Sequence, residues 1–228
     1  MVITQSDFDY KWFHFLPQQK RKKGNNATKQ KFYYKDIITA FDIETTYIKE
    51  IDASVMYIWQ WQFGLEYTVM GRTWEELAAF QIELASRIRE DCSLVILVHN
   101  LSYEFQFLKG IYPFTADEVF ATDHRKVLKC SMYGHLEFRC SYYHSNMKLE
   151  TFLDKMGVEH KKTTLDYDKI RYPWTPLDDK ELEYCINDVK GLVQALQKKL
   201  SVEGYTLASI PLTKTGYVRN DVRKALKN

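Results

Sequence analysis

Five consecutive aliphatic residues, Leu94 to Val98, place a strong restriction on the fold of this chain. A strand that carries apolar side chains on both faces has to be covered on both sides, as in a sheet that lies between helices. The run is far too short to cross a membrane. The sequence therefore predicts a mixed α/β domain in which other elements cover both faces of this strand.

The segments before this strand predict a small sheet and a helix. Strands are expected at Ile37–Ile43, Val55–Phe63 and Tyr67–Met70, and the alternation in the second is typical of a half-buried strand. Three strands in succession favour an antiparallel meander. Thr73 and Glu76 have the spacing of a capping box, which predicts a helix to about residue 90.

The segments after the buried strand predict further helices and a hairpin. We expect a helix at Tyr103–Leu108, a hairpin that turns at Tyr133 and Gly134, a short helix over 148–156 and a long loop over 157–174. The last helix is expected to begin at Thr175 as its N-cap, with Pro176 at the first helical position, and to end near Leu200.

Size and composition indicate one ordinary domain with modest additions. The chain has 228 residues, of which 45% are hydrophobic, enough to bury a substantial core and to exclude a disordered protein. We expect a basic N-terminal extension over 1–36, the α/β domain over 37–200 and a basic C-terminal tail over 201–228. The first twelve residues contain acids where a secretory signal needs basic and apolar residues, so a cytoplasmic protein is expected. We also expect a monomer, and no membrane segment is expected because the longest aliphatic run is short.

Positive charge is concentrated in one segment. Residues 20–35 contain seven of the 32 Lys and Arg residues and no acid until Asp36, so the remainder has 25 basic and 30 acidic residues. Such a basic strap on a negative body would suit a polyanionic ligand near an acidic metal site. The alternative is a solvated loop without a partner.

The first chemical motif is the pair Asp42 and Glu44 in AFDIETT, at the end of the first expected strand. Residues two apart on a strand point to the same face, so the two carboxylates converge. Because like charges repel, a divalent cation with a preference for oxygen ligands would stabilise them. The alternative is a strand end that simply faces water.

Two further motifs contain an acid that is expected to lie on a helix. In LVILVHNLSYEF, Glu104 follows a buried strand end, although an acid in the first turn of a helix is favourable in itself. In LEYCINDVKGL, Tyr184 and Asp188 are four residues apart and share one face of a helix. A core tyrosine above a surface acid would look the same.

Taken together, the three motifs resemble those of 3′–5′ proofreading exonuclease domains with an RNase H-like fold. The motifs are similar to those of the protein-primed family B DNA polymerases of bacteriophages: DxE comes first, then HNL with an aromatic residue and an acid, then YxxxD. Lys162 and Tyr167 in HKKTTLDYDKIR match the lysine and tyrosine that precede the third motif in that family. The resemblance covers about residues 36–200 and implies an α/β, RNase H-like domain with a mixed sheet flanked by helices.

The resemblance also implies a two-metal mechanism. Asp42, Glu44 and Asp188 would hold one Mg²⁺ or Mn²⁺ ion, and Asp42 with Glu104 would hold a second about 3.5–4 Å away, which together stabilise the attacking and leaving oxygens. Tyr184 would orient the attacking water, and Lys162 would offset charge on the scissile phosphate.

Single-stranded DNA 3′ ends are the partner that the family implies. The positions that match its DNA ligands are Thr45, Asn100, Tyr103, Phe107, Ser141, Tyr142 and Tyr167. Aromatic side chains that stack on bases bind without sequence preference. No polymerase region is recognised after the basic tail, so no DNA synthesis is expected. Two alternatives remain: an exonuclease domain excised from a longer protein, with a polymerase domain of the same protein as its partner, or a free-standing nuclease.

The sequence departs from the family pattern at two positions. Glu104 stands where the second motif normally has aspartate, and Tyr142 replaces a leucine after Ser141. The longer acid can still reach a metal, with reduced activity as one consequence. One alternative is therefore a catalytically weak module that binds single-stranded DNA, in which Glu104 marks the loss of activity. Another is a 3′–5′ exoribonuclease of the same fold, because no residue in the sequence indicates whether the 2′-hydroxyl is recognised.

Overall fold

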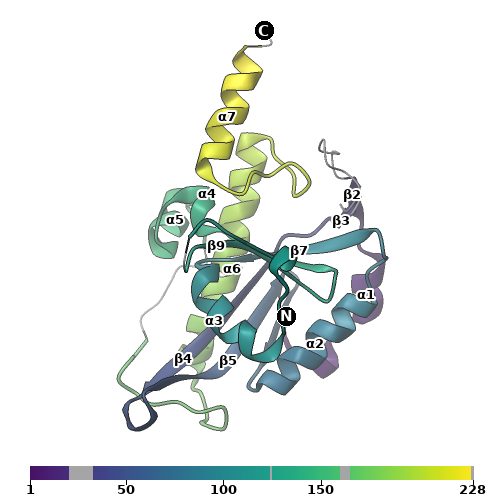
Figure 1. Ribbon diagram of the computed structural model, residues 1–228. Coiled ribbons are helices and arrows are strands. Elements are labelled where there is room, and N and C mark those ends of the chain that lie inside the picture. Colours follow the sequence, from purple (N-terminus) through teal and green to yellow (C-terminus); the bar gives the residue numbers. More distant parts are fainter. Residues whose placement is uncertain (21–32, 124, 160–164, 227–228) are drawn as a thin grey trace.

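The computed structural model describes residues 1–20, 33–123, 125–159 and 165–226. Its centre is a mixed sheet with helices on both faces (Figure 1). The strands of this sheet are β1 (Val2–Thr4), β2 (Gln18–Lys20), β3 (Tyr33–Lys35), β4 (Thr39–Ile48), β5 (Ala53–Phe63), β6 (Tyr67–Gly71), β7 (Cys92–Val98), β8 (Val119–Ala121), β9 (Val127–Met132) and β10 (Leu136–Cys140).

Seven α-helices are found in the described residues. They are α1 (Tyr10–Phe15), α2 (Trp74–Ser86), α3 (Leu101–Ile111), α4 (Tyr142–Ser145), α5 (Leu149–Met156), α6 (Asp179–Glu203) and α7 (Lys214–Ala225). Short 3-10 helices lie at Gln5–Asp7, Lys49–Ile51 and Ala116–Glu118. Within the described ranges, no helix combines the length and the apolar character needed to span a bilayer.

The sheet topology is RNase H-like. Strands follow the order β1-β6-β5-β4-β7-β10-β9-β8, with β3 beside β7 and β2 beside β3. The run β4-β5-β6 is an antiparallel meander, as predicted, whereas β7 pairs in parallel with both β4 and β10. The expected mixed sheet flanked by helices is therefore confirmed.

Strand β7 separates two hydrophobic cores. Its side chains alternate between them: Leu94, Ile96 and Val98 join the core under α2 and α3, and the intervening Val95 and Leu97 join the core under α5 and α6. Every residue of β7 is buried. The prediction that this strand is covered on both faces is confirmed.

Local sequence signals for the first helix and the hairpin are also confirmed. The Thr73 hydroxyl accepts a hydrogen bond from the Glu76 amide, and the Glu76 carboxylate accepts one from the Thr73 amide, which completes the capping box of α2. Tyr133 and Gly134 both have positive φ in the turn between β9 and β10, as a tight hairpin turn requires.

Strands β4 and β5 differ from the prediction. β4 continues to Ile48, because its pairing with β5 resumes after an irregularity between Glu44 and Thr45; Asp42 and Glu44 therefore lie in the middle of the strand rather than at its end. β5 is buried on both faces from Met56 onward rather than half-buried, since α6 covers the face that carries the polar residue Gln60.

The start of the long helix was predicted three residues too early. Asp178, not Thr175, is the N-cap of α6, and its carboxylate accepts a hydrogen bond from the Glu181 amide. The Glu181 carboxylate accepts one from the Asp178 amide in return, so a full capping box holds this end. Thr175 instead accepts a hydrogen bond from the Tyr172 amide in the preceding loop.

The N-terminal segment is part of the fold rather than an extension. β1 pairs with β6, and Phe8 and Phe13 are buried in the core beside α2. Of the basic strap over 20–35, Lys35 is buried and its ammonium donates to the carbonyls of Phe13 and His14. Lys20 is exposed at the end of β2, and residues 21–32 of the strap lie outside the described residues.

The C-terminal segment also contributes to the core. α7 extends away from the sheet (Figure 1), yet Tyr217 in its first turns is buried in the core under α5 and α6. Leu207 and Ile210, in the connection from α6, are buried in the same core. We predicted only a basic tail here, because the apolar residues are too few and too widely spaced to reveal a packed helix.

Candidate metal centre

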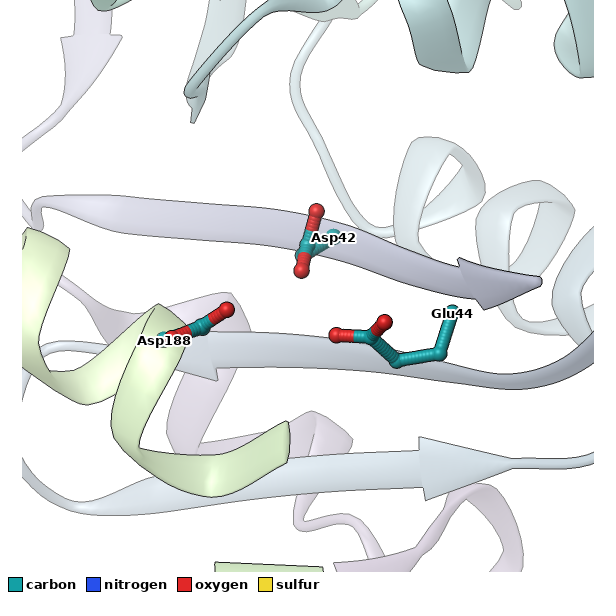
Figure 2. A group of neighbouring side chains, drawn as sticks. All are labelled: Asp42, Glu44 and Asp188. Atoms are coloured by element: carbon teal, nitrogen blue, oxygen red, sulfur yellow. The ribbon is translucent and has the colours of Figure 1, made fainter. Parts of the chain in front are cut away.

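Three carboxylates meet between β4 and α6. Asp42 and Glu44 project from the same face of β4, and Asp188 projects from α6 toward them (Figure 2). One ligand oxygen of each residue lies within 4.8 Å of those of the other two. Asp188 is buried and the other two are half-buried. The structure therefore brings together the first metal-binding set that the sequence predicted.

Glu104 lies beside this group, in the first turn of α3. Its side chain is only 4% exposed, and its Oε2 atom has no hydrogen-bond partner among the described residues. Burial, and after it the neighbouring Asp42 carboxylate, raise the pKa of Glu104 well above its usual range. The fourth predicted acid is thus in contact with the first three through Asp42.

The donor set fits a hard divalent cation. All four side chains offer carboxylate oxygens, the ligands that Mg²⁺ and Mn²⁺ prefer. A buried carboxylate oxygen without a partner is costly, and so are like charges in close contact. A cation bound among these oxygens would remove both costs.

Tyr184 and Tyr167 form a hydroxyl pair next to the acids. Tyr184 lies one turn before Asp188 on α6 and is 2% exposed. Its hydroxyl is 3.0 Å from that of Tyr167, which is 71% exposed on the loop before α6. Burial, followed by the charges of Glu44 and Asp188, raises the pKa of Tyr184, so the phenol keeps its proton and can donate it in a hydrogen bond.

A row of aromatic rings leads away from the acids along α3. The Tyr103 hydroxyl is 2.5 Å from the Thr45 hydroxyl, and the Tyr103 ring is 5.2 Å from that of Phe107. Phe107 in turn stacks against Trp74 at 6.1 Å. Tyr103 is 40% exposed, so its ring is accessible to a ligand. Trp74 was not predicted from the sequence, because nothing in its position at the start of α2 relates it to α3.

Two of the remaining predicted DNA ligands, Asn100 and Tyr142, line a cleft at the ends of β7 and β10. This cleft of about 440 Å³ is lined by residues that include Asn100, Tyr142 and Lys148. Tyr142 is partly exposed there. Ser141, in contrast, is fully buried, and its hydroxyl lies 3.1 Å from Nδ1 of His99. Its hydroxyl therefore faces His99 and not the surface.

One predicted catalytic residue cannot be placed. Lys162 lies outside the described residues. The loop that follows is described from residue 165 onward. Its position depends on Arg171, which bonds to Glu181 on α6 and was not predicted from the sequence. A single arginine in a loop has no periodicity or spacing that would indicate its partner ten residues further along.

Comparison with known proteins gives structural matches only. No protein-family model and no curated protein matches the sequence. Among solved structures, phi29 DNA polymerase complexed with single-stranded DNA aligns with a TM-score of 0.61 at 13% identity, over 74% of this chain and 32% of that one. Its ternary complex with primer-template DNA and incoming nucleotides aligns with a TM-score of 0.60 at 15% identity, over 74% and 31%.

A further match is the EXO domain of Aedes aegypti Nibbler, with a TM-score of 0.48 and 15% identity over 84% of this chain and 86% of that one. In the match to phi29 DNA polymerase, the chain spans about a third of the length of that polymerase. At these identities the likeness to the polymerase establishes a shared fold.

Proposed function

We propose that this protein is a metal-dependent 3′–5′ exonuclease that hydrolyses phosphodiester bonds at the ends of single-stranded DNA. The observation that carries the proposal is the meeting of Asp42, Glu44 and Asp188 within 4.8 Å on an RNase H-like sheet. The adjoining Glu104 and Tyr184 complete the set of residues expected from the motifs. The shared fold with a polymerase solved on single-stranded DNA supports the choice of substrate.

The carboxylates have the role of metal ligands in this proposal. Asp42, Glu44 and Asp188 would hold one Mg²⁺ or Mn²⁺ ion, and Asp42 with Glu104 would hold a second. When bound, such ions neutralise charge on the phosphate and lower the pKa of a coordinated water. Because Glu104 is buried, it would stay next to Asp42 with little freedom to turn toward solvent.

Tyr184 would orient the attacking water. Its proton is retained, its hydroxyl lies beside that of Tyr167, and the charges of Glu44 and Asp188 act on it, so it can donate a hydrogen bond to an oxygen atom in the site. Lys162 is proposed to offset charge on the scissile phosphate.

Exposed rings and polar groups around the acids would bind the strand. Tyr103 and Phe107 offer stacking surfaces, and Thr45 holds the Tyr103 hydroxyl in place. Asn100 and Tyr142 at the neighbouring cleft would bind the next nucleotides. Ser141 would act indirectly, by fixing His99 beside the cleft.

We further propose that the nuclease serves to remove nucleotides during DNA replication, in association with a polymerase domain. The match to about a third of a phage polymerase supports this association. Residues 37–200 are proposed as the catalytic unit, completed by the packed segments on either side.

A cleavage assay on labelled oligonucleotides tests the proposal. Single-stranded DNA with a 5′ label is incubated with Mg²⁺, Mn²⁺ or EDTA, and an RNA oligomer is run alongside. We expect a metal-dependent ladder of shortened DNA that is lost in Asp42→Ala and retained in Asp221→Ala, which removes an exposed aspartate on α7.

Two results would change the assignment. A ladder from RNA alone would make the protein an exoribonuclease, since recognition of the 2′-hydroxyl decides between the two substrates. Intact DNA and RNA with every metal, from protein that is folded and binds single strands, would contradict a nuclease and favour a binding module.

A further inference from the structure

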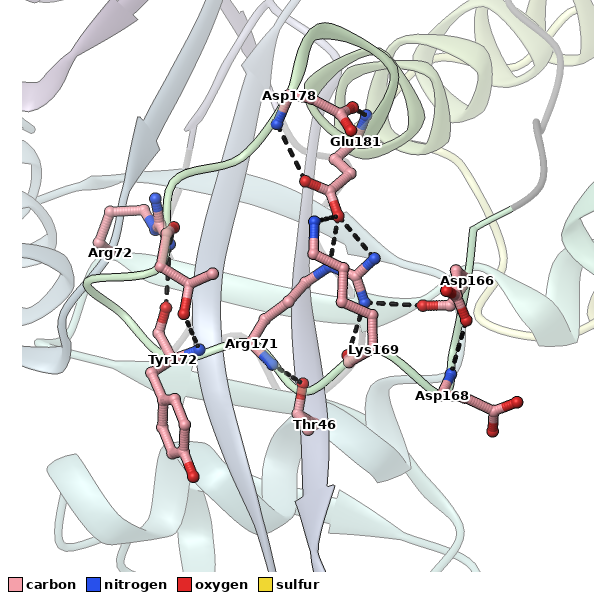
Figure 3. A network of polar contacts seen from close by, with 10 residues as sticks. Thr46, Arg72, Asp166, Asp168, Lys169, Arg171, Tyr172, Asp178 and Glu181 are labelled. Atoms are coloured by element: carbon pink, nitrogen blue, oxygen red, sulfur yellow. Dashed lines mark hydrogen bonds and ion pairs between the residues drawn. The ribbon is translucent and has the colours of Figure 1, made fainter.

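Arg171 is a buried arginine at the centre of a polar network in the loop before α6 (Figure 3). Residues 165–178, here called the 165–178 loop, contain no helix or strand. The Arg171 side chain is 2% exposed, and its Nε and one terminal nitrogen lie 2.7 and 2.6 Å from Oε1 of Glu181. The other terminal nitrogen donates to the carbonyls of Asp166 and Lys169, at 2.7 and 2.8 Å.

Each of these contacts reaches a segment that carries a residue of the candidate site. The carbonyls of Asp166 and Lys169 flank Tyr167 in the loop. Glu181 lies one turn before Tyr184 on α6. The Arg171 amide donates to the Thr46 hydroxyl at 3.1 Å, two residues after Glu44 on β4. One side chain and its amide thus join the loop, the helix and the strand.

Secondary contacts hold the same arrangement. Lys169 donates to the Glu181 oxygen that Arg171 also uses, at 2.6 Å. Arg72, between β6 and α2, donates to the carbonyls of Tyr172 and Thr175, at 3.0 and 2.7 Å. The loop therefore has two arginine anchors, of which only Arg171 bonds the backbone on both sides of Tyr167.

We propose that Arg171 is a positioning residue that holds the Tyr167 hydroxyl against that of Tyr184 and so fixes the orientation of Tyr184 for catalysis. This inference rests on the proposed nuclease function. A buried ion pair is a weak source of stability, because apolar replacements of similar volume are often neutral or better. The fork of the guanidinium, in contrast, fixes the direction of several acceptors at once, which a lysine cannot do.

Arg139 provides a matched control from the same molecule. It is also buried and ion-paired, with a terminal nitrogen 2.6 Å from Glu137 and another contact of 3.0 Å to the Tyr34 hydroxyl. Its guanidinium lies over the Tyr34 ring, much as that of Arg171 lies over Tyr57. None of these partners belongs to the candidate site, so R139M disturbs a buried pair without disturbing the hydroxyl pair.

The experiment compares wild type, R171M, R171K and R139M in steady-state cleavage of single-stranded DNA. We expect R171M to lower kcat about 10- to 100-fold, the cost of misplacing a group near the reacting atoms. KM should change less than kcat, because Tyr167 is only one of several predicted DNA ligands. R171K should fall between R171M and wild type. R139M should keep kcat within about twofold of wild type per folded molecule.

A double-mutant cycle shows whether Arg171 acts through Tyr184. In a Tyr184→Phe background the hydroxyl pair is already absent, so R171M should lower kcat by about twofold or less. A further full loss in that background would overturn the proposed route. If R171M does not fold, the same cycle with R171K decides the question.

Hydrogen exchange of the metal-free protein supplies a readout that does not depend on cleavage. R171M should speed exchange in the 165–178 loop, and R139M should leave that loop unchanged. If wild type cleaves DNA while R171M and R139M are alike in kcat and in loop exchange, the positioning role is wrong and the nuclease function stands. If wild type shows no metal-dependent cleavage, the proposed function itself fails.

Discussion

Replacing Glu104 by glutamine should make the metal-free protein more stable while it removes a metal ligand. The side chain is buried beside Asp42, and Oε2 has no hydrogen-bond partner among the described residues. Glutamine keeps the shape, removes the charge and offers an amide that can donate to the Asp42 carboxylate. Folding of the wild-type protein without metal therefore has to overcome a cost that the variant does not have.

The size of this effect follows from the burial. A buried polar group without a partner costs about 1–3 kcal/mol, so we expect the free energy of unfolding of Glu104→Gln at pH 8 to exceed that of wild type by about 2 kcal/mol. In a chain of this length that corresponds to a midpoint about 4–8 °C higher.

The pH dependence has a definite sign. The folded-state pKa of Glu104 is raised, whereas the pKa of an unfolded glutamate is about 4.3. The cost is therefore absent below about pH 4.3 and grows as the pH rises toward the folded-state value. The difference between variant and wild type should be small at pH 5 and larger at pH 8.

Thermal unfolding in EDTA at pH 5 and pH 8 measures this difference. Glu75→Gln is a suitable control, because Glu75 is an exposed acid in the first turn of α2, as Glu104 is a buried acid in the first turn of α3. Adding Mn²⁺ should raise the wild-type midpoint more than that of Glu104→Gln. An equal or lower midpoint for the variant at pH 8 in EDTA would refute the reasoning.

Three further predictions concern catalysis, binding and pH. Tyr184→Phe should lower kcat about 10-fold or more with little change in KM, because only the hydroxyl that orients the water is lost. An unchanged rate constant for cleavage under single-turnover conditions would contradict this role. Tyr103→Ala should weaken binding of single-stranded DNA by about 1–3 kcal/mol in a fluorescence titration, the value of one stacked base, whereas equal affinity would place the strand elsewhere. Burial, and then the charges of Arg139 and Lys199, lower the pKa of His144 to about 3. An unfolded histidine has a pKa of about 6.5. The free energy of unfolding, measured by urea titration, should therefore fall between about pH 6.5 and about pH 3, by up to about 1.4 kcal/mol per pH unit. His144→Gln should show a shallower slope, and identical slopes would count against a neutral buried imidazole.

Sequence patterns were sufficient for those parts of the fold that rest on local chemistry. The aliphatic run at Leu94 to Val98, the capping box of Thr73 and Glu76 and the turn at Tyr133 each have a short-range physical cause, and each is found as predicted. The convergence of Asp42 with Glu44, and of Tyr184 with Asp188, was predicted for a related reason, since two strand residues share a face and two helix residues one turn apart do so as well. That these pairs and Glu104 belong to one site was implied only by the resemblance of the motifs to a known family.

Features that depend on distant contacts were not predictable in this way. Phe8 and Phe13 look like part of a polar extension until β1 is paired with β6. The network of Arg171 depends on which strand and helix flank the loop, and Ser141 is buried because His99 lies opposite it. In each case the partners lie on separate elements and have no periodic spacing in the sequence, so no spacing rule relates them.

The most direct test of the central claim is anomalous diffraction from crystals soaked in Mn²⁺. We expect an anomalous peak at the carboxylate oxygens of Asp42, Glu44 and Asp188, with Glu104 beside a second peak when substrate is present. Asp42→Asn crystals should lack the first peak. Well-ordered wild-type crystals with no peak among these three side chains at saturating Mn²⁺, or with the metal bound elsewhere, would contradict the claim that they form a metal centre.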